Sequence, residues 1–223
     1  MCGRFALDIP LSALAGFFRV DEIIDIGPRF NISPTQMVPA IFNDSDTGRR
    51  VLKMFRWGLI PSWAKDASIG SRLINARSET AAEKPAFRSA FRRRRCLIPT
   101  TGFYEWKRSG TSKHPYHICM RDSALFAFAG LWEQWQGGEQ GAVETCAILT
   151  CEPNELMSPI HNRMPVIIEP SEYDLWLDTG VTDTNALKPL MKSYPADRMT
   201  AYPVSARVNT PSNNDPSCIV PLV

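Results

Sequence analysis

The second residue of this 223-residue chain, Cys2, can do chemistry that an internal cysteine cannot do. We expect Met1 to be removed because the next side chain is small, which would leave cysteine at the N-terminus. A free α-amine has a pKa near 7.7–8.0 and a thiol one near 8.5, so both are nucleophilic at neutral pH. The amine can form a Schiff base with an aldehyde, and the thiol can then close a five-membered ring on the same carbon. The alternative is that Cys2 is a small apolar residue on an early strand, and its position alone does not decide.

Two further residues could move protons. Glu105 lies between Tyr104 and Trp106 in CLIPTTGFYEWK, and a carboxylate beside bulky aromatic side chains tends to have a raised pKa that suits general acid–base work. Strand alternation alone would also allow it to point to water. His161 lies in the proline-bounded loop SPIHNRMPV, where catalytic groups concentrate, although a lone histidine is more often structural.

The other two histidines do not form a metal site. His114 and His117 precede Cys119 with the spacing H-x-x-H-x-C, and alternation sends only His117 and Cys119 to one face, without a fourth ligand. The sequence contains no GxSxG, P-loop, HExxH or GxGxxG motif, so the serine hydrolase, nucleotide-binding and zincin interpretations lack their signatures. We therefore expect neither a metal nor a cofactor.

Basic residues are interleaved with aromatic residues and amides. Guanidinium groups hold phosphates, aromatic faces stack on bases and amides orient the sugar or backbone, which is what single-stranded nucleic acid requires. Taken singly, each of these residues could equally be an ordinary surface or core residue. The basic run at residues 92–95 is left outside the site, because a charge run at a helix end is usually a solvated face. The interleaved residues are Arg4 with Phe5, Arg29 with Phe30 and Asn31, Arg56 with Trp57, Trp63, and Asn75 with Arg77.

The elements that must position these residues are mostly strands. Alternating or short apolar stretches predict strands at residues 51–57, 116–120, 125–131, 144–150, 165–168 and 218–223, with a hairpin loop at 137–141. Helical spacing predicts helices at residues 11–18, 83–95, 171–177 and from 184 onward, the first capped by Asp8. Strands therefore outnumber helices, and the many prolines predict rigid connections.

The composition is that of an ordinary globular protein. Hydrophobic residues make up 44% of the chain and charged residues 22%, and the length fits a single domain over residues 1–223. A net charge of +2 is too mild to indicate or exclude a nucleic-acid partner. The sequence has neither a membrane-spanning apolar run nor a signal peptide, so we expect a cytoplasmic location and six reduced cysteines, most of them in the core.

Taken together, the motifs resemble the SOS response-associated peptidase (SRAP) family. The resemblance spans residues 2–222 and includes MCGRF, RFNISPT, WGLIPSWA, LINARSET, CLIPTTGFYEW, LTCEPN, SPIHNRMPV and the closing CIVPL, in the family's order. It implies an α+β fold, mainly antiparallel β and barrel-like, with flanking helices. It also implies a protein that binds single-stranded DNA, recognises abasic sites and cross-links covalently to the minor open aldehyde of the abasic sugar. We expect the protein to be a monomer.

The resemblance also implies roles for particular residues. Cys2 would be the nucleophile that ends as a thiazolidine. Glu105 would assist opening of the sugar ring and reversal of the cross-link, and His161 would handle protons in Schiff-base formation and hydrolysis. Asn75 would orient the nucleophile and the sugar. The DNA contacts would be Arg4, Arg77 and Arg163 on phosphates, Trp57 and Trp63 supporting or stacking near a DNA end or bend, and Asn31 and Thr150 in the same groove or pocket.

Three interpretations remain open at this stage. The Schiff base acidifies the neighbouring sugar proton, so lyase activity accompanies the cross-linking interpretation. In a cysteine peptidase, Cys2 would attack a peptide, His161 would be the base and Glu105 the orienting carboxylate; the substrate might be only the Met1–Cys2 bond. In a non-catalytic single-strand-binding module, Cys2 would be inert. Any preference for a DNA end or junction is undetermined.

Overall fold

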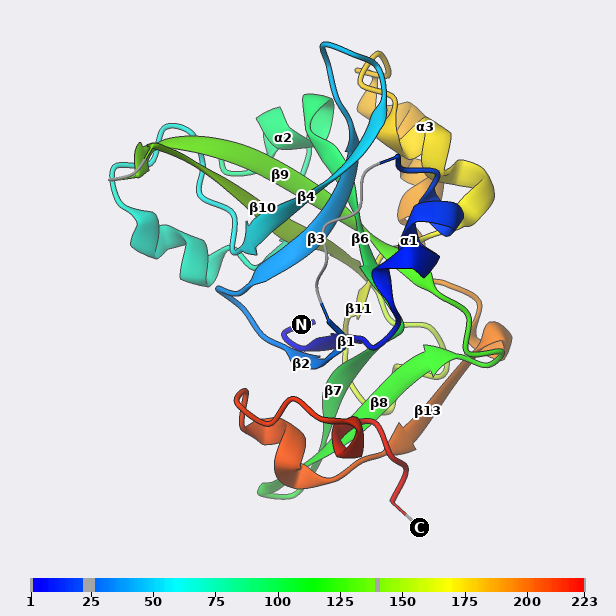
Figure 1. The fold of residues 1–223 in the computed structure, drawn as a ribbon. Helices are drawn as coiled ribbons and strands as arrows, with labels where there is room; N and C mark the ends of the chain where they lie inside the picture. Colours follow the sequence, from blue (N-terminus) through cyan, green and yellow to red (C-terminus); the bar gives the residue numbers. More distant parts are fainter. Residues whose placement is uncertain (1, 22–26, 139–140, 223) are drawn as a thin grey trace.

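The computed structural model describes residues 2–21, 27–138 and 141–222. Within these residues, the strands form one five-stranded and one eight-stranded sheet, and the helices are short (Figure 1). The helices are α1 (Leu11–Phe18), α2 (Arg88–Arg93) and α3 (Tyr173–Leu177). The strands are β1 (Phe5–Leu7), β2 (Arg29–Ile32), β3 (Met37–Asn43), β4 (Arg50–Trp57), β5 (Asn75–Arg77), β6 (Arg95–Thr100), β7 (Gly102–Ser109), β8 (Ser112–Met120), β9 (Phe126–Gly138), β10 (Gly141–Cys151), β11 (Met164–Pro165), β12 (Ile167–Ile168) and β13 (Met199–Pro203).

The larger sheet closes on itself. Its strands pair in the order β10, β4, β3, β6 and β9, and β9 also pairs with β10, so these five strands form a closed barrel. The pairings are antiparallel except for β10 with β4, which is parallel. Closure removes the free strand edges that an open sheet would expose. The expectation of a mainly antiparallel, barrel-like α+β fold is confirmed.

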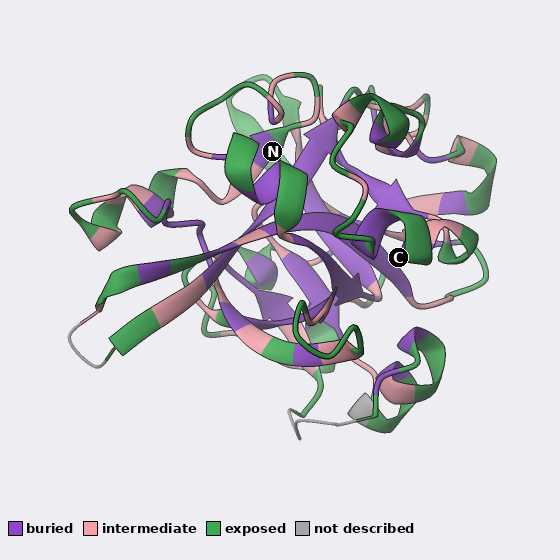
Figure 2. Ribbon diagram, turned by 90° about the horizontal axis from the view of Figure 1, so that it is seen from above, coloured by how far each residue is buried: buried purple, intermediate pink, exposed green. Residues whose placement is uncertain are grey.

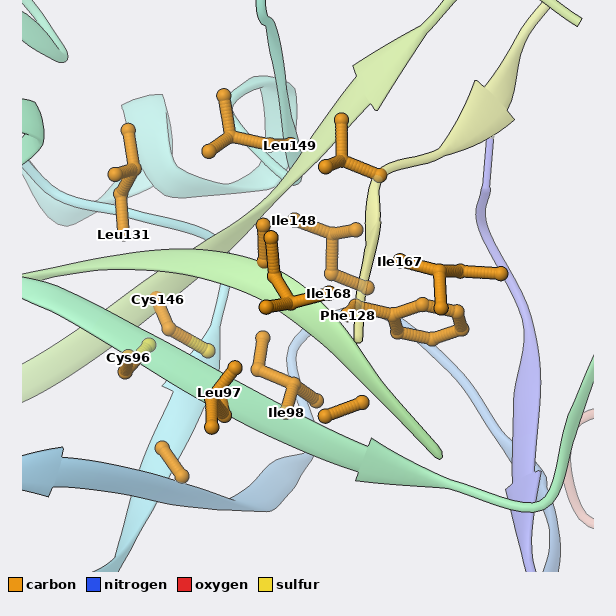
Figure 3. Packing of buried hydrophobic residues seen from close by; sticks show 14 of the residues in the cluster. Cys96, Leu97, Ile98, Phe128, Leu131, Cys146, Ile148, Leu149, Ile167 and Ile168 are labelled. Carbon is orange, nitrogen blue, oxygen red and sulfur yellow. The ribbon is translucent and has the colours of Figure 1, made fainter. Parts of the chain in front are cut away.

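Alternating apolar side chains fill this barrel and the layer beside it. Leu97 and Ile98 of β6, Phe128 of β9 and Ile148 of β10 lie close together in the core (Figure 3). Gly130 on β9 has no room for a side chain, because a Cβ there would lie 2.6 Å from the Sγ of Cys96. The buried strands gather at the centre of the molecule, and the helices and connections around them carry the exposed residues (Figure 2).

The smaller sheet has the order β13, β8, β7, β1, β2 and is antiparallel throughout. Its strand β1 lies between β7 and β2. Phe5 of β1 packs edge-on against Trp57 of the barrel at 5.2 Å and against Phe128 at 5.8 Å between ring centroids. This aromatic contact joins the smaller sheet to the barrel, so the N-terminal strand lies at the junction of the two sheets.

Most of the predicted elements are present, although several differ in their ends or in the kind of helix. The helix at residues 11–18 is present, but Asp8 does not cap it; the Asp8 carboxylate accepts a hydrogen bond from the Thr101 hydroxyl, and Pro10 is the capping residue. Residues 171–177 form a short 3₁₀ turn followed by α3, and residues 184–191 form a 3₁₀-helix. Strands β9 and β10 form the predicted hairpin, whose residues 139 and 140 lie outside the described residues.

Two predictions of secondary structure are wrong. The helix expected over residues 83–95 is restricted to α2, because Arg95 is buried in β6 and donates hydrogen bonds to main-chain carbonyl oxygens, including that of Trp176 at 2.7 Å. The strand expected over residues 218–223 is replaced by a 3₁₀ turn at Pro216–Cys218 and a single bridge between Pro221 and Val204. In both places tertiary contacts override the local pattern.

All six cysteines are free thiols, and only Cys119 is partly exposed. The prediction that most of them are core thiols is therefore confirmed. His117 and Cys119 both line the same side of β8 near Tyr202, whose hydroxyl lies 2.9 Å from the Nδ1 of His117. No helix within the described residues is long and apolar enough to cross a membrane.

Candidate functional site

Pairing between β1 and β7 positions the start of the chain. Phe5 pairs with Phe103, and the Tyr104 main-chain N–H donates to the Arg4 carbonyl at 2.9 Å. Continuing this antiparallel register places Gly3 opposite Glu105. Main-chain hydrogen bonds thereby bring Glu105 next to Gly3, from which it is 102 positions away in the sequence. Cys2 itself is fully buried.

Asn75 holds Cys2 from the barrel side. Its Nδ2 donates to the Cys2 carbonyl oxygen at 2.8 Å. Asn75 is the first residue of β5, which pairs in parallel with the end of β10, so that Asn75 lies opposite Ile148. One side-chain hydrogen bond therefore connects the N-terminal segment of the smaller sheet to the larger sheet, at the residue predicted to be the nucleophile.

Glu105 is a buried carboxyl group, with only 3% of its surface exposed. Burial raises its pKa to about 7, because the charged form is poorly solvated. Burial also raises the pKa of the Cys2 thiol, and the negative charge of Glu105 adds to this effect. Near neutral pH, Glu105 can therefore both give and accept a proton, while the thiol of Cys2 is protonated.

His161 lies close to this carboxyl group. Its Nε2 is 4.0 Å from the Oε2 of Glu105, and the loop between β10 and β11 carries it. Nδ1 lies 3.0 Å from the Arg163 main-chain N–H and 3.3 Å from the Arg163 carbonyl. The shorter contact favours Nδ1 as the acceptor, with the proton of the neutral ring on Nε2, the nitrogen nearer Glu105. Burial lowers the pKa of His161 below its ordinary value, so the ring is neutral at pH 7.

An ion pair fixes the His161 loop. Arg163 donates from both terminal nitrogens to the Glu79 carboxylate, at 2.7 and 2.9 Å, and from Nη2 to the Thr150 carbonyl at 2.6 Å. These hydrogen bonds from Arg163 hold the pKa of Glu79 below its ordinary value. A fork-to-fork pair of this kind restricts the guanidinium in orientation as well as position. Arg163 therefore acts here as a structural link, rather than as the free phosphate contact that the resemblance implies.

Glu79 was not among the predicted site residues, although a signal for it exists. The motif LINARSET, which contains Asn75 and Arg77, also contains Glu79. The sequence could not show that its partner would be Arg163, because the two residues are 84 positions apart.

Arg4 and Asn31 face the C-terminal segment. Arg4 donates to the Asn31 Oδ1 at 2.7 Å and to the Val208 carbonyl at 2.6 Å, and its guanidinium lies 5.8 Å from the Trp106 ring. The Asn31 side-chain amide donates to main-chain carbonyls, the nearest being that of Asn213 at 2.7 Å. Asn31 is only 2% exposed, so its side chain holds the C-terminal segment here, and its assignment as a DNA contact stays a prediction. Arg4 is half-buried and keeps its assignment as a prediction.

Trp57 and Thr150 are buried as well. The Trp57 indole N–H donates to the Ile74 carbonyl at 2.9 Å, and its ring packs against Phe5. The Thr150 hydroxyl donates to the Ala76 carbonyl at 3.4 Å. Neither side chain is exposed, so both support the site from beneath, which for Trp57 is the supporting role and not the stacking one; their roles in DNA binding stay predictions.

Exposed members of the predicted set line an open groove. Trp63 is 60% exposed, and Arg77 is exposed at the end of β5. Together with Asn75, Lys84 and Phe87 they border a cavity of about 410 Å³. Cys2 does not line this groove, and Asn75, which borders the groove and donates to the Cys2 carbonyl, is the link between them. The groove combines an aromatic face with cationic groups, as a single strand of nucleic acid requires.

The structure thus brings together a thiol residue, a carboxyl group that titrates near neutral pH and a neutral imidazole, beside a partly cationic groove. Within the described residues, no group of three or more His, Cys, Asp and Glu side chains is arranged to hold a metal ion. This combination suits proton transfer and nucleophilic addition to a carbonyl carbon.

Comparisons with known proteins agree with these motifs. The model of the family described as SOS response associated peptidase (SRAP) matches residues 1–211. The chain belongs to the SRAP family. Among curated relatives, the abasic site processing protein YoqW of Bacillus subtilis is 46% identical over 223 residues, which cover 98% of this chain and 99% of the relative. The abasic site processing protein HMCES of Xenopus tropicalis is 32% identical and covers 88% of this chain and 67% of its own.

Solved structures share the fold of this SRAP protein. A crystal structure of a protein from Bacteroides thetaiotaomicron superimposes with a TM-score of 0.90 at 26% identity and covers both chains completely. A phage-related protein from Bordetella bronchiseptica gives a TM-score of 0.74 at 28% identity, over 91% of this chain and 94% of that one.

The Glu79–Arg163 pair leads to a prediction about His161. In Glu79→Ala, Arg163 loses its carboxylate partner and the loop that presents its N–H to His161 loosens. We expect the Nε2–H tautomer of His161 to become a mixture and the pKa of His161 to rise toward its ordinary value, as water reaches the ring. Nitrogen-15 NMR of labelled histidine measures both. Glu169→Ala, which breaks the exposed pair with Arg198, is the matched control, and unchanged His161 signals in Glu79→Ala would contradict the positioning role.

Proposed function

We propose that this protein captures abasic sites in single-stranded DNA by forming a covalent thiazolidine on Cys2. The observation that carries the proposal is the fixation of the Cys2 main chain by Asn75, next to the Glu105–His161 pair. The names of the relatives, abasic site processing proteins, support the substrate. The chemistry requires removal of Met1, a residue that lies outside the described residues.

The reaction begins with the α-amine. The open form of an abasic deoxyribose carries an aldehyde at C1′, which the amine attacks to give a carbinolamine. Loss of one water gives a Schiff base between the nitrogen and C1′. The Cys2 sulfur then adds to C1′, and the thiol proton moves to the nitrogen as the C=N bond becomes a C–N bond. The product is a five-membered ring, and the net change is the gain of the DNA minus one water.

Glu105 supplies the proton for ring opening. The closed sugar opens when its ring oxygen is protonated as the C1′–O bond breaks and the C1′ hydroxyl loses its proton. A carboxyl group with a pKa of about 7 is half protonated at neutral pH, so it can donate without a large free-energy cost. The same group can return the proton when the adduct is reversed.

His161 and the buried thiol suit a reaction that begins with the amine. A neutral imidazole with its proton on Nε2 can assist loss of water from the carbinolamine. A peptidase that uses Cys2 as its first nucleophile needs a thiolate, whereas burial raises the pKa of the Cys2 thiol. In the proposed order of steps the thiol adds second, to the C1′ carbon that the Schiff base has already activated. The protonated thiol can therefore react, because its proton moves to the nitrogen. This difference favours capture of an aldehyde over cleavage of a peptide.

Lyase activity follows from the same intermediate. The Schiff base acidifies the proton at C2′ of the sugar, and removal of that proton expels the 3′ phosphate by β-elimination. Rapid ring closure by the Cys2 thiol competes with this step, because it consumes the Schiff base. We therefore propose that strand scission is the minor route in the intact protein and becomes the major route when the thiol is absent.

The groove would hold the strand around the lesion. Arg77 would contact a flanking phosphate and Trp63 would stack on a base or a duplex end, with Arg4 as a further phosphate contact. Asn75 would orient the Cys2 carbonyl, and with it the amine. We propose a monomer acting on DNA in the cytoplasm, with no metal or cofactor in the chemistry.

Replacement of Cys2 separates the two stages of the reaction. Cys2→Ala retains an N-terminal amine after removal of Met1 but has no thiol. We expect no adduct that survives denaturation, a Schiff base that borohydride traps, and more strand scission than in the native protein, all measured on denaturing gels with a labelled abasic oligonucleotide. Cys119→Ala is the matched control and should cross-link normally. A stable adduct in Cys2→Ala would disprove the mechanism, and a native protein that forms none would favour a simple binding module.

The proposed role of Glu105 predicts a characteristic pH dependence. The single-turnover cross-linking rate should rise with pH as the amine loses its proton, level off near pH 7 as Glu105 loses its own, and fall above the pKa of the amine. In Glu105→Gln the falling limb should disappear, and the rate at pH 6.5 should drop by about 100-fold or more, because the amide cannot donate a carboxyl proton. A native profile without the falling limb, or one that Glu105→Gln retains, would contradict this role.

A further inference from the structure

The four arginines at residues 92–95 divide into two groups. Arg95 is buried and donates to the main-chain carbonyls of Trp176, Phe91 and Arg92. Arg94 pairs with the Glu133 carboxylate at 2.7 Å. These two side chains stabilise the fold and are not available to a partner. The other two, on α2, remain exposed.

The exposed cations of α2 form a row. The Arg88 main-chain N–H donates to the Lys84 carbonyl at 2.9 Å, which closes a single turn just before α2. Lys84 therefore lies one turn ahead of Arg88, and Arg88 and Arg92 lie one turn apart on α2, about 6 Å along its axis. Arg88, Arg92 and Arg93 border a surface hollow of about 410 Å³ together with Ser89.

This row is not neutralised by ion pairs. Within the described residues, no salt bridge involves Lys84, Arg88, Arg92 or Arg93. Glu79 and Glu83 border a separate hollow that Arg92 also lines, but neither forms a salt bridge with Arg92, and Glu79 is already paired with Arg163. Like charges one turn apart repel each other. In a chain with a net charge of only +2, their concentration here indicates an anionic partner.

The row continues the groove described above. Lys84 and Phe87 line the groove together with Asn75 and Arg77, and Arg88 follows Phe87 directly. A chain of phosphates that leaves the groove past Lys84 would therefore meet Arg88 next. The hollow at α2 offers guanidinium groups and a hydroxyl, but no aromatic face, which suits contact with the backbone rather than with bases.

We propose that Lys84, Arg88, Arg92 and Arg93 bind the phosphates of the DNA strand where it leaves the groove, on one side of the lesion only. The identity of the anion rests on the proposed function, whereas the surface itself rests on the geometry of α2. The contacts are to phosphates, so the row adds affinity without adding sequence preference. Because the row leads away from one end of the groove, it would also set the direction in which the strand runs past the site.

The salt dependence of binding tests this row. Arg88→Gln/Arg92→Gln is compared with the native protein and with the matched control Arg19→Gln/Arg49→Gln, which also removes two exposed charges. The probes are fluorescent single strands of about 20 and about 5 nucleotides without an abasic site, the shorter one filling only the groove. Fluorescence anisotropy at several salt concentrations gives the slope of log K against log salt.

For the longer strand, we expect the slope of log K against log salt to be smaller in magnitude by about 1.4 in the α2 variant, which corresponds to two lost phosphate contacts. Binding at 0.1 M salt should then be about 25-fold weaker. The shorter strand and the control variant should show no such change. Equal slopes for the native protein and the α2 variant on the longer strand would overturn the proposal and leave α2 to another anionic partner, such as an acidic protein.

Cross-linking separates this inference from the proposed function. With subsaturating DNA, the α2 variant should cross-link more slowly when a long flank lies on one side of the abasic site, and at the native rate when the flank lies on the other. Equal rates for both polarities would contradict the one-sided path. If the native protein forms no cross-link at all, the proposed function fails, but the anisotropy result still decides whether α2 binds a strand.

Discussion

Main-chain pairing between β1 and β7 is the interaction on which the site depends. It holds the first residues of the chain beside Glu105 through hydrogen bonds that require no particular side chains. The contacts of Phe5 with Trp57 and Phe128 then anchor this strand to the barrel. Because an N-terminus is normally free to fray, the amine that the proposed function requires at Cys2 needs such anchoring. The buried strand converts a flexible chain end into a group of fixed position.

Burial has a second consequence, which is chemical. The same packing that fixes Cys2 removes water from Glu105 and raises its pKa to about 7, so one arrangement supplies both position and proton-transfer capacity. His161 comes from a different part of the chain and needs its own support, which the Arg163–Glu79 pair provides. The site therefore rests on two rigid units, a strand pair and a loop held by an ion pair, that meet at Glu105 and His161.

The sequence predicted what depends on local pattern and composition. Alternation located the main strands, and the types of Cys2, Glu105 and His161 indicated the chemistry. Burial by distant partners could not be predicted from the sequence. Asn31 and Trp57 are residue types that occur in nucleic-acid sites, but their partners in the fold bury them. For the same reason helix α2 ends early and the last strand is absent. The single domain over residues 1–223 and the monomeric state stay predictions.

The most direct test of the account is the intact mass of the purified protein before and after incubation with a single strand that carries one abasic site, followed by peptide mapping of the adduct. The account predicts a starting mass without Met1, a gain equal to the oligonucleotide minus one water, and an adduct located on the N-terminal Cys2 peptide. A protein that lacks Met1 and gains no mass, or an adduct mapped to an internal lysine or cysteine, would contradict it.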